Sequence, residues 1–389
     1  MKSSIVTGID IGSYATRVVI SEHSSSFPIP RIRGIGFAET KGVRNGYVHN
    51  IASVTQSIAR AIQQAQTTAK IKISRAFVSI GGISLSSNTV MASNIISKAD
   101  GEVTQLDMTN ILVNAEEQFA GQYKNRRILH TIPISYTLDN HPVLGNPVGM
   151  RGMKLDASIL FISALNQHVE DLITAVSHAG VSVLDIVAAP VASSLVTLSP
   201  RQKQVGVLLV DIGSETVSMA VFERDIVTSL EVLPTGGMDI TNDIALGFKV
   251  PLDEAETLKR GESGAHSKKK IDQIVEARLK DVFDLVDAHL KKIRRSGLLP
   301  AGIVMTGGGS ALHSIEEYAK AVLRLPSKVA SAELLAKYKQ KLPDSSWLVA
   351  YGLCFLPDSD YGDISRTKVA MTWNQVKRAI SNFFKNLLP

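Results

Sequence analysis

Two stretches about half a chain apart share one pattern of apolar and polar positions. Residues 207–222 form an apolar run, the tetrapeptide DIGS at 211–214, and then a run in which apolar and polar residues alternate. Residues 5–20 repeat this order around a second DIGS at 10–13. A short apolar run bounded by a glycine turn is typical of a buried strand, and alternation is typical of its paired neighbour. We therefore predict two β-hairpins with acidic tips, one in each of two duplicated halves.

The segments between and after the hairpins switch between helical and strand-like spacing. Apolar residues recur every three or four positions where we predict helices, and short apolar runs mark the predicted strands. The predicted helices span 51–69, 104–118, 166–180, 188–198, 238–248, 253–259 and 271–293, and the predicted strands span 75–80, 89–96, 128–138, 157–164, 181–187 and 302–306. Between 83 and 165 the pattern changes, and a loop rich in glycine and proline covers 139–152. We interpret 83–165 as a small inserted α+β subdomain.

The order of these elements predicts two lobes and a separate C-terminal segment. The first lobe comprises 1–82, 166–199 and about 347–357, with the inserted subdomain at 83–165. The second lobe has a core at 200–237 and 300–346 and an outer subdomain at 238–299. A linker at 358–370 leads to an amphipathic helix at 371–389. The chain is expected to cross between the lobes at 200–204.

Composition and charge narrow the class of protein. The 389 residues are 44% hydrophobic and include one cysteine, Cys354, which excludes an internal disulfide. The first 22 residues lack a signal-peptide pattern and no apolar run is long enough to span a bilayer, so we expect a cytoplasmic protein. Five of the six net positive charges lie in 364–389, which argues against nucleic-acid binding by the body of the protein. The nine histidines show no metal-site spacing.

A run of three lysines, Lys268 to Lys270, ends a charged loop predicted at 260–270. Such runs are usually solvated, and contact with an acidic partner or with lipid is the alternative. We assign the run no role.

The two predicted tips combine the groups that bind nucleotide phosphates. Gly12 and Gly213 let backbone N–H groups approach an anion, and Ser13 and Ser214 add hydroxyl donors. A carboxylate on each tip can hold the waters of a Mg²⁺ ion. A purely structural polar turn is the alternative for either tip alone, but two copies in matching strand context favour phosphate binding.

Two further glycine motifs stand beside predicted elements. Gly236 and Gly237 precede the helix predicted at 238–248, and the triplet 307–309 follows the strand predicted at 302–306. Glycine after a buried strand lets another surface lie against the backbone. A flexible turn is the alternative for the triplet.

These motifs, in this order, resemble the actin superfamily and, more narrowly, the FtsA family of bacterial cell-division proteins. The matching stretches are LHTIP at 129–133 with NPVG at 146–149, PTGGMDITNDIA at 234–245, and DEAETLK at 253–259. The resemblance runs from about residue 5 to the end of the chain. It implies an α/β, actin-like (ribonuclease-H-like) duplicated fold with two lobes around a nucleotide cleft and an FtsA-type inserted subdomain.

The resemblance also implies ATP and Mg²⁺ in the cleft. Asp10 and Asp211 are the candidate metal-associated and catalytic residues, with Mg²⁺ held through water. The residues implied to bind the nucleotide are Gly12, Ser13, Tyr14, Arg17, Gly213, Ser214 and Glu215 at the phosphates, Gly236 and Gly237 at the sugar and phosphates, Glu256 and Lys259 at the ribose and adenine, and Gly307, Gly308 and Gly309 at the adenine face.

Two positions depart from the family pattern. Actin-like ATPases commonly place a glutamate before the proline of the segment that matches 189–193, where this chain has Ala189. Alanine cannot orient an attacking water, so we predict very slow hydrolysis and a switch-like use of ATP. A lysine often found two residues after the first-tip serine is Ala15, and Arg17 on the same strand face is the candidate replacement.

The C-terminal segment predicts an amphipathic helix that lies on a membrane surface. Thr372 and Gln375 form a capping-box pattern. The residues assigned to the membrane are Trp373, Val376, Ile380, Phe383, Phe384, Leu387 and Leu388 on the apolar face and the basic residues Lys377, Arg378 and Lys385. Packing against the protein's own core and pairing with a partner helix are the alternatives.

The FtsA resemblance implies a cell-division protein that self-assembles into filaments and binds the C-terminal peptide of the tubulin-like FtsZ. Together with the C-terminal helix, this predicts a tether for FtsZ, attached to anionic lipid on the inner face of the cell membrane at the division site, with other division proteins as partners. An FtsA-related type IV pilus scaffold, favoured by the Ser13-x-x-x-Arg17 spacing, is one alternative. A small-molecule kinase of the same superfamily is the other.

Overall fold

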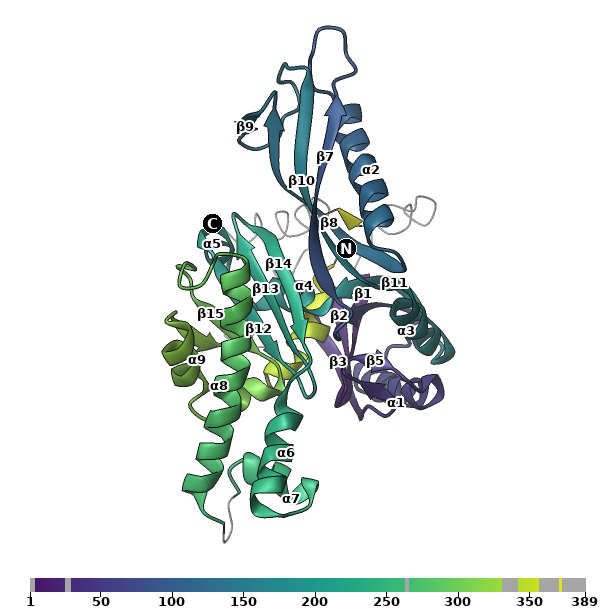
Figure 1. Cartoon of the computed structure of the whole chain (residues 1–389). Helices are drawn as coiled ribbons and strands as arrows, with labels where there is room; N and C mark the ends of the chain where they lie inside the picture. Colours follow the sequence, from purple (N-terminus) through teal and green to yellow (C-terminus); the bar gives the residue numbers. More distant parts are fainter. Residues whose placement is uncertain (1–3, 25–28, 263–265, 331–341, 357–370, 373–389) are drawn as a thin grey trace.

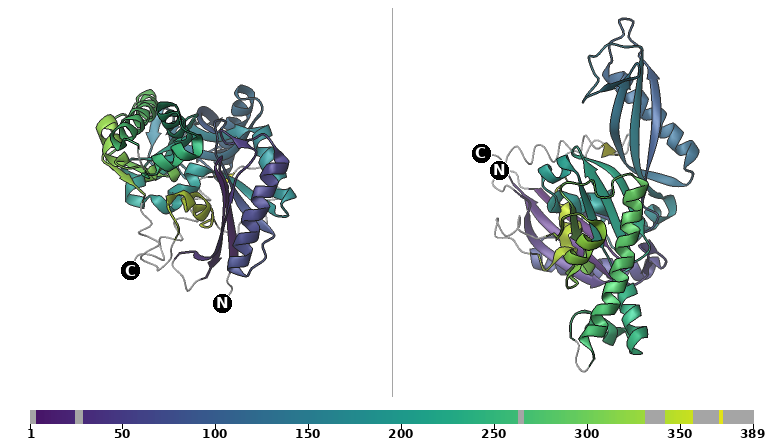
Figure 2. Two further views of the ribbon diagram at one scale, coloured as in Figure 1. Left: turned by 90° about the horizontal axis from the view of Figure 1, so that it is seen from below. Right: turned by 60° about the vertical axis from the view of Figure 1, so that its left-hand side comes forward.

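The computed structural model describes residues 4–24, 29–262, 266–330, 342–356 and 371–372. The described residues form two lobes that lie side by side (Figure 1). An inserted subdomain projects from one end of the molecule, and a group of outer helices projects from the opposite end (Figure 2).

Each lobe is built on a five-stranded sheet of the same topology. The first sheet has the order β3-β2-β1-β6-β11 and the second β14-β13-β12-β15-β16, with three antiparallel strands followed by parallel ones in both. The bounds are β1 Ser4–Ile11, β2 Ala15–His23, β3 Arg31–Glu39, β6 Arg75–Ile80, β11 Ser182–Ala188, β12 Val207–Ile212, β13 Val217–Glu223, β14 Ile226–Leu233, β15 Ile303–Thr306 and β16 Ser327–Val329. The predicted duplication is confirmed strand by strand.

Helix α1 (Ile51–Ala69) packs closely against β3 in the first lobe. Its N-terminus is capped by the Asn50 side chain, which accepts from the Ser53 N–H at 3.0 Å. Close packing depends on Gly36, where an added Cβ would lie 1.9 Å from the carbonyl oxygen of Ala61. The other helices of this lobe are α3 (Asn166–His178), α4 (Ala189–Thr197) and α11 (Leu348–Leu353).

The inserted subdomain is a small sheet covered by one helix. Its strands are β7 (Ser86–Ile95), β8 (Arg126–Leu138), β9 (His141–Val143) and β10 (Lys154–Leu165), and α2 (Gln105–Gln122) packs on them. The predicted helix at 104–118 therefore extends to 122, and Thr104 is its capping residue. Phe119 of α2 meets Phe161 of β10 in the core, with ring centroids 4.9 Å apart.

The start of the predicted C-terminal helix is a strand. Met371–Thr372 (β17) pairs in parallel with His130 and Thr131 of β8, so these two residues are not helical. The rest of that prediction, and the linker at 358–370, lie outside the described residues.

The outer part of the second lobe consists of α6 (Gly237–Phe248), α7 (Leu252–Lys259) and α8 (Lys268–Lys292), and α9 (Ile315–Leu323) packs beside α8. The prediction of a loop up to residue 270 is wrong, because the three lysines form the first turn of α8. Lysine is a good helix former, and Lys270 Nζ donates to the Gly247 carbonyl at 2.7 Å. Among the described helices none is both long and apolar enough to cross a membrane.

The chain crosses between the lobes in a short helix, α5 (Pro200–Val205), that carries a buried lysine. Lys203 Nζ lies 3.4 Å from Ser194 Oγ and 5.4 Å from the centroid of the Phe222 ring. Burial lowers the pKa of Lys203 to about 8.

We expect Lys203→Met to stabilise the protein by about 1–2 kcal/mol at pH 7, because an apolar side chain of similar length avoids desolvating a charge. Because the pKa is lowered in the native state, charged Lys203 destabilises that state below pH 8. Between pH 8 and about 10.5 the native state has lost this proton while the unfolded chain keeps it, so the parent gains stability and the stability difference between variant and parent shrinks. Thermal unfolding at pH 7 and pH 9.5 measures this. A stability difference between variant and parent that is the same at pH 7 and pH 9.5 would contradict it.

Candidate functional site

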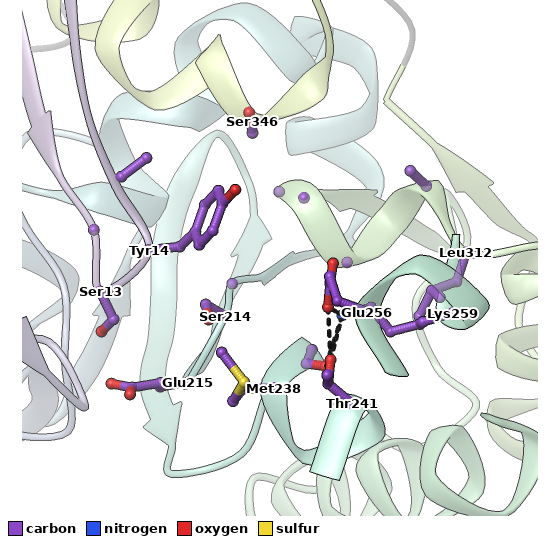
Figure 3. A pocket seen from close by; sticks show the side chains of 18 of the residues that line it. Ser13, Tyr14, Ser214, Glu215, Met238, Thr241, Glu256, Lys259, Leu312 and Ser346 are labelled. Carbon is purple, nitrogen blue, oxygen red and sulfur yellow. Dashed lines mark hydrogen bonds and ion pairs between the residues drawn. The ribbon is translucent and has the colours of Figure 1, made fainter. Parts of the chain in front are cut away.

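The two predicted tips are the same turn used twice. In the first, the Gly12 N–H donates to the Ala15 carbonyl at 3.1 Å, and in the second, the Gly213 N–H donates to Thr216 at 2.8 Å. Both turns line one cavity of about 1530 Å³ that lies between the lobes. Figure 3 shows Ser13 and Tyr14 from the first tip close to Ser214 and Glu215 from the second.

Two carboxylates stand at matching positions on the strands that lead to the tips, and both line the cavity. Asp10 is the next-to-last residue of β1 and accepts a hydrogen bond from Ser79 Oγ at 2.6 Å, and desolvation raises its pKa. Desolvation, with the negative charge of Asp10 added, raises the pKa of Asp211 to about 7. Two desolvated carboxylates facing one cavity are a site that a cation would stabilise.

The donor set suits a cation that keeps its own waters. No group of three or more histidine, cysteine, aspartate or glutamate residues that could hold a metal occurs in the part of the chain that the structure describes. Mg²⁺ characteristically keeps several waters and binds through one or two carboxylates plus phosphate oxygens. Asp10 and Asp211 therefore fit Mg²⁺ bound together with a nucleotide.

Arg17 offers a buried donor to the same cavity. It is paired with Asp10 across the β1–β2 hairpin and lines the cavity. Its guanidinium carbon lies 5.7 Å from the centroid of the Phe37 ring and 5.9 Å from that of Trp347. Its Nε is buried without a hydrogen-bond partner. Because buried donors are normally paired, an anion in the cavity would complete this site.

The glycine pair that precedes α6 supports the second tip. The Gly237 N–H donates to the Gly213 carbonyl at 2.9 Å, and the Met238 N–H donates to Ser214 at 2.7 Å. A Cβ on Gly236 would lie 2.5 Å from the Ser214 carbonyl oxygen. The pair therefore fixes the tip, and Gly237 also lines the cavity.

The predicted ribose and adenine residues form a polar cluster on α6 and α7 (Figure 3). Lys259 Nζ lies 2.6 Å from Glu256 Oε2 and 2.8 Å from Thr241 Oγ1. The Thr241 hydroxyl donates to Glu256 at 2.7 Å, and Arg260 Nε donates to it at 3.0 Å. Although burial raises the pKa of Glu256, these hydrogen bonds outweigh it and the pKa is lowered. Glu256 is thus held ionised at the cavity wall.

The glycine triplet packs against the second tip and also lines the cavity. Gly307 has φ +84°, and a Cβ there would lie 2.3 Å from Asp211 Oδ1. A Cβ on Gly309 would lie 2.4 Å from Ile212 Cγ2. A Cβ on Gly308 would meet nothing within 4 Å, and all three glycines line the cavity.

Ala189 also lines the cavity, at the first turn of α4. Its methyl group offers no hydrogen-bond acceptor to a water there. The family-typical glutamate is therefore missing at a position that faces the predicted nucleotide.

The structure adds a turn that the sequence reasoning missed. Asn45 and Gly46 connect β4 (Val43–Arg44) to β5 (Tyr47–Val48) and contact both tips. The Asn45 N–H donates to Glu215 Oε2 at 2.5 Å, and the Gly46 N–H donates to Ser13 Oγ at 3.1 Å. The Asn-Gly pair is itself a strong hairpin signal, but its reach to a residue 170 positions away is not visible in the sequence.

The residues assigned to a membrane-facing helix, from Trp373 to Leu388, lie outside the described residues. Their assignment stays a prediction.

Comparisons with known proteins show to which sequences this chain is similar. A family model of cell division protein FtsA matches residues 208–352, and a model of the SHS2 domain inserted in FtsA matches residues 82–163. The cell division protein FtsA of Pseudomonas aeruginosa is 30% identical over 348 residues, which cover 84% of this chain and 82% of the relative. That of Neisseria meningitidis is 28% identical, covering 90% and 89%.

Solved structures share the fold at lower identity. A chain of the PilM-PilN type IV pilus biogenesis complex has a TM-score of 0.68 at 18% identity, covering 90% of this chain and 97% of its own. MreB5 of Spiroplasma citri bound to ADP has a TM-score of 0.53 at 13% identity, covering 93% and 98%. The predicted actin-like fold is confirmed for the described residues.

Proposed function

The chain belongs to the FtsA family of bacterial cell-division proteins, and from this premise we propose that it binds ATP with Mg²⁺ between its lobes and tethers FtsZ filaments to the inner face of the cell membrane. An actin-like cell-division protein is the established part of this description. The nucleotide, the tether and its partners are the proposal, which includes self-assembly into filaments.

One observation carries the nucleotide part of the proposal. Asp10 and Asp211 meet at one cavity with raised pKa values, and Arg17, whose buried Nε has no hydrogen-bond partner, lines the same cavity. A triphosphate with Mg²⁺ supplies the cation that the carboxylates lack and the acceptor that Arg17 lacks. MreB5, which shares this fold, was solved bound to ADP, and this supports nucleotide binding as part of the proposal.

The chain's own residues divide the work of holding the nucleotide. The tips, with Ser13, Ser214 and the backbone of Gly12 and Gly213, would bind the phosphates, while Asp10 and Asp211 would orient the waters of Mg²⁺. The cluster around Glu256 and Lys259 would face the ribose and adenine, and the triplet 307–309 would lie along the base. When bound, Mg²⁺ would neutralise phosphate charge.

Ala189 favours a switch over a fast enzyme. We expect Ala189→Glu to raise steady-state phosphate release about tenfold, because a carboxylate there can orient the attacking water. Phosphate release by the purified parent and variant, with thermal unfolding as a control for folding, measures this. Fast release by the parent, at many turnovers per minute, would contradict the switch.

The membrane part of the proposal comes from the sequence of the last segment. An apolar, aromatic face with Lys377, Arg378 and Lys385 beside it suits a helix in the headgroup layer of anionic lipid. We expect deletion of 373–389 to abolish sedimentation with anionic liposomes while ATP binding is retained. Changing the three basic residues to glutamine should weaken binding to anionic liposomes only.

Adding the FtsZ C-terminal peptide to the same assay tests the tether. Full-length protein should carry the peptide into the liposome pellet, and the deleted protein should leave it in the supernatant. Unchanged lipid sedimentation of the deleted protein would refute the membrane helix, and a peptide that never pellets with the full-length protein would refute the tether. For the pilus-scaffold alternative, this chain shares its fold with a chain of a pilus complex at 18% sequence identity, whereas its sequence identity to a division protein reaches 30%.

A further inference from the structure

The turn formed by Asn45 and Gly46 lies where three parts of the molecule meet. Both residues have positive φ, 49° and 79°, as a two-residue hairpin turn requires. One side of the turn contacts the tips of both lobes. Its other side contacts the segment through which the chain enters the inserted subdomain.

The contacts to the tips involve Ser13 and Glu215, which both line the cavity. The Asn45 N–H donates to the carboxylate of Glu215 in the second lobe, and the Gly46 N–H donates to Ser13 Oγ in the first. A hydrogen bond to a carboxylate is strong and sensitive to nearby charge. Phosphates between the tips would place negative charge beside Glu215 and engage the Ser13 hydroxyl, so both bonds depend on whether the cavity is filled.

The contact with the inserted subdomain leaves no free space. A Cβ on Gly46 would lie 2.3 Å from the Cα of Gly82, and Gly82 itself has φ +87°. The Ile83 N–H also approaches the Asn45 carbonyl oxygen, at 3.4 Å. Because close-packed contacts transmit displacement, a shift of the turn must move Gly82, four residues before β7 begins.

A second contact of the same hairpin reaches the base of the inserted subdomain. The Tyr47 ring packs on His168 with centroids 4.7 Å apart, and His168 Nδ1 lies 2.8 Å from Ser84 Oγ. The Ser84 carbonyl accepts from the Arg126 guanidinium at 2.6 Å, and Arg126 begins β8. The hairpin thus contacts the segment before β7 directly and is linked to the start of β8 only through His168 and Ser84.

We propose that the Asn45–Gly46 turn couples occupancy of the nucleotide cavity to the orientation of the inserted subdomain on the first lobe. This inference rests on the ATP binding proposed above. It assigns regulation to a turn that lies outside the residues predicted to hold the nucleotide.

The test measures one distance within the first lobe. Spin labels are placed at Ala59→Cys on α1 and Leu144→Cys on the inserted subdomain, both exposed, while the native Cys354 is buried. The inserted subdomain also contacts the second lobe, where Ser87 Oγ donates to the Leu230 carbonyl at 3.0 Å. Movement of the lobes can therefore change this distance as well, and the variants of the turn and its neighbour separate that route from the proposed one. Pulsed electron paramagnetic resonance is recorded without nucleotide and with saturating Mg²⁺ and AMPPNP, and AMPPNP affinity is measured separately with a fluorescent analogue.

We expect AMPPNP to shift the distance in the parent and in Gly81→Ala, whose added methyl would meet nothing within 4 Å. Gly82→Ala, whose methyl would lie 2.9 Å from the Asn45 carbonyl oxygen, should bind AMPPNP but lose the shift. Glu215→Gln is a second variant, used in case Gly82→Ala does not fold, and it keeps the shape of the side chain. It should also lose the shift in label distance at saturating nucleotide.

A parent-like shift in both Gly82→Ala and Glu215→Gln would overturn the coupling. A parent that binds AMPPNP with no change in distance would overturn it too and leave the proposed function standing. A parent that binds no nucleotide would overturn the proposed function, and the coupling with it.

Discussion

Replacing Gly307 with alanine is expected to destabilise the protein by about 3 kcal/mol or more, whereas the same change at Gly308 should leave stability unchanged. Gly307 has φ +84° and ψ 170°, a conformation that is open essentially only to glycine and costs an L-residue about 1–3 kcal/mol. Its added Cβ would lie 2.3 Å from Asp211 Oδ1 and 2.5 Å from the Ile212 carbonyl oxygen. The clash involves the backbone of the second tip, so relaxation has to distort the tip. Differential scanning calorimetry measures the loss, expected as a fall in Tm of about 6 °C or more.

The neighbouring glycine separates binding from folding. An alanine methyl at Gly308 would meet nothing within 4 Å and would project into the cavity where we place the base. We expect Gly308→Ala to keep the parent Tm and to weaken ATP binding about tenfold, a loss of about 1.4 kcal/mol. ATP affinity unchanged in Gly308→Ala would remove the triplet from the nucleotide site. A parent-like Tm in Gly307→Ala would contradict the packing of the triplet on the second tip.

Elements that depend on neighbouring residues were predictable from the sequence. The alternating runs around the two DIGS motifs identify the hairpins, and the apolar spacing in 51–69 identifies α1 to the residue. Strand β3 is absent from the prediction because Gly34 and Gly36 interrupt its pattern, although they are what let α1 pack on it. The short apolar run of α11 has too few residues for periodicity to separate helix from strand.

Relations between distant parts of the chain were not predictable in this way. Periodicity can place Glu215 on a tip, but it cannot show that the carboxylate accepts from Asn45 in the other lobe. Similarly, the sequence places Gly236 before a helix, and only the fold shows that it packs on Ser214. The tip residues were therefore found from their chemistry and the other candidate residues through the family resemblance, whereas the contacts that position them required the structure.

The second large effect concerns Asp211. We expect Asp211→Asn to stabilise the nucleotide-free protein above pH 7 by about 2 kcal/mol and to weaken Mg²⁺-ATP binding at least about a hundredfold. Desolvation and the charge of Asp10 raise the pKa of Asp211 to about 7, from an ordinary value of 3.8. An amide of the same shape carries no charge to desolvate, but it also attracts the waters of Mg²⁺ far less. Stability and binding should therefore change in opposite directions.

The pH dependence of this difference follows from the raised pKa. Between about pH 4 and 7 the native state holds a proton on Asp211 that the unfolded chain has released, so the parent loses stability as pH rises through this range. Asp211→Asn lacks this loss. The difference in Tm between the variant and the parent should therefore increase from pH 5 to pH 8 and stay constant above pH 8. Ser218→Ala, which changes the neighbour paired with Asp211 across the hairpin, serves as a control without a change in charge. A Tm difference between variant and parent that is the same at pH 5 and pH 8 would show that Asp211 is ionised throughout. The two carboxylates would then not destabilise each other, and the reason for proposing a Mg²⁺-ATP site between them would be lost.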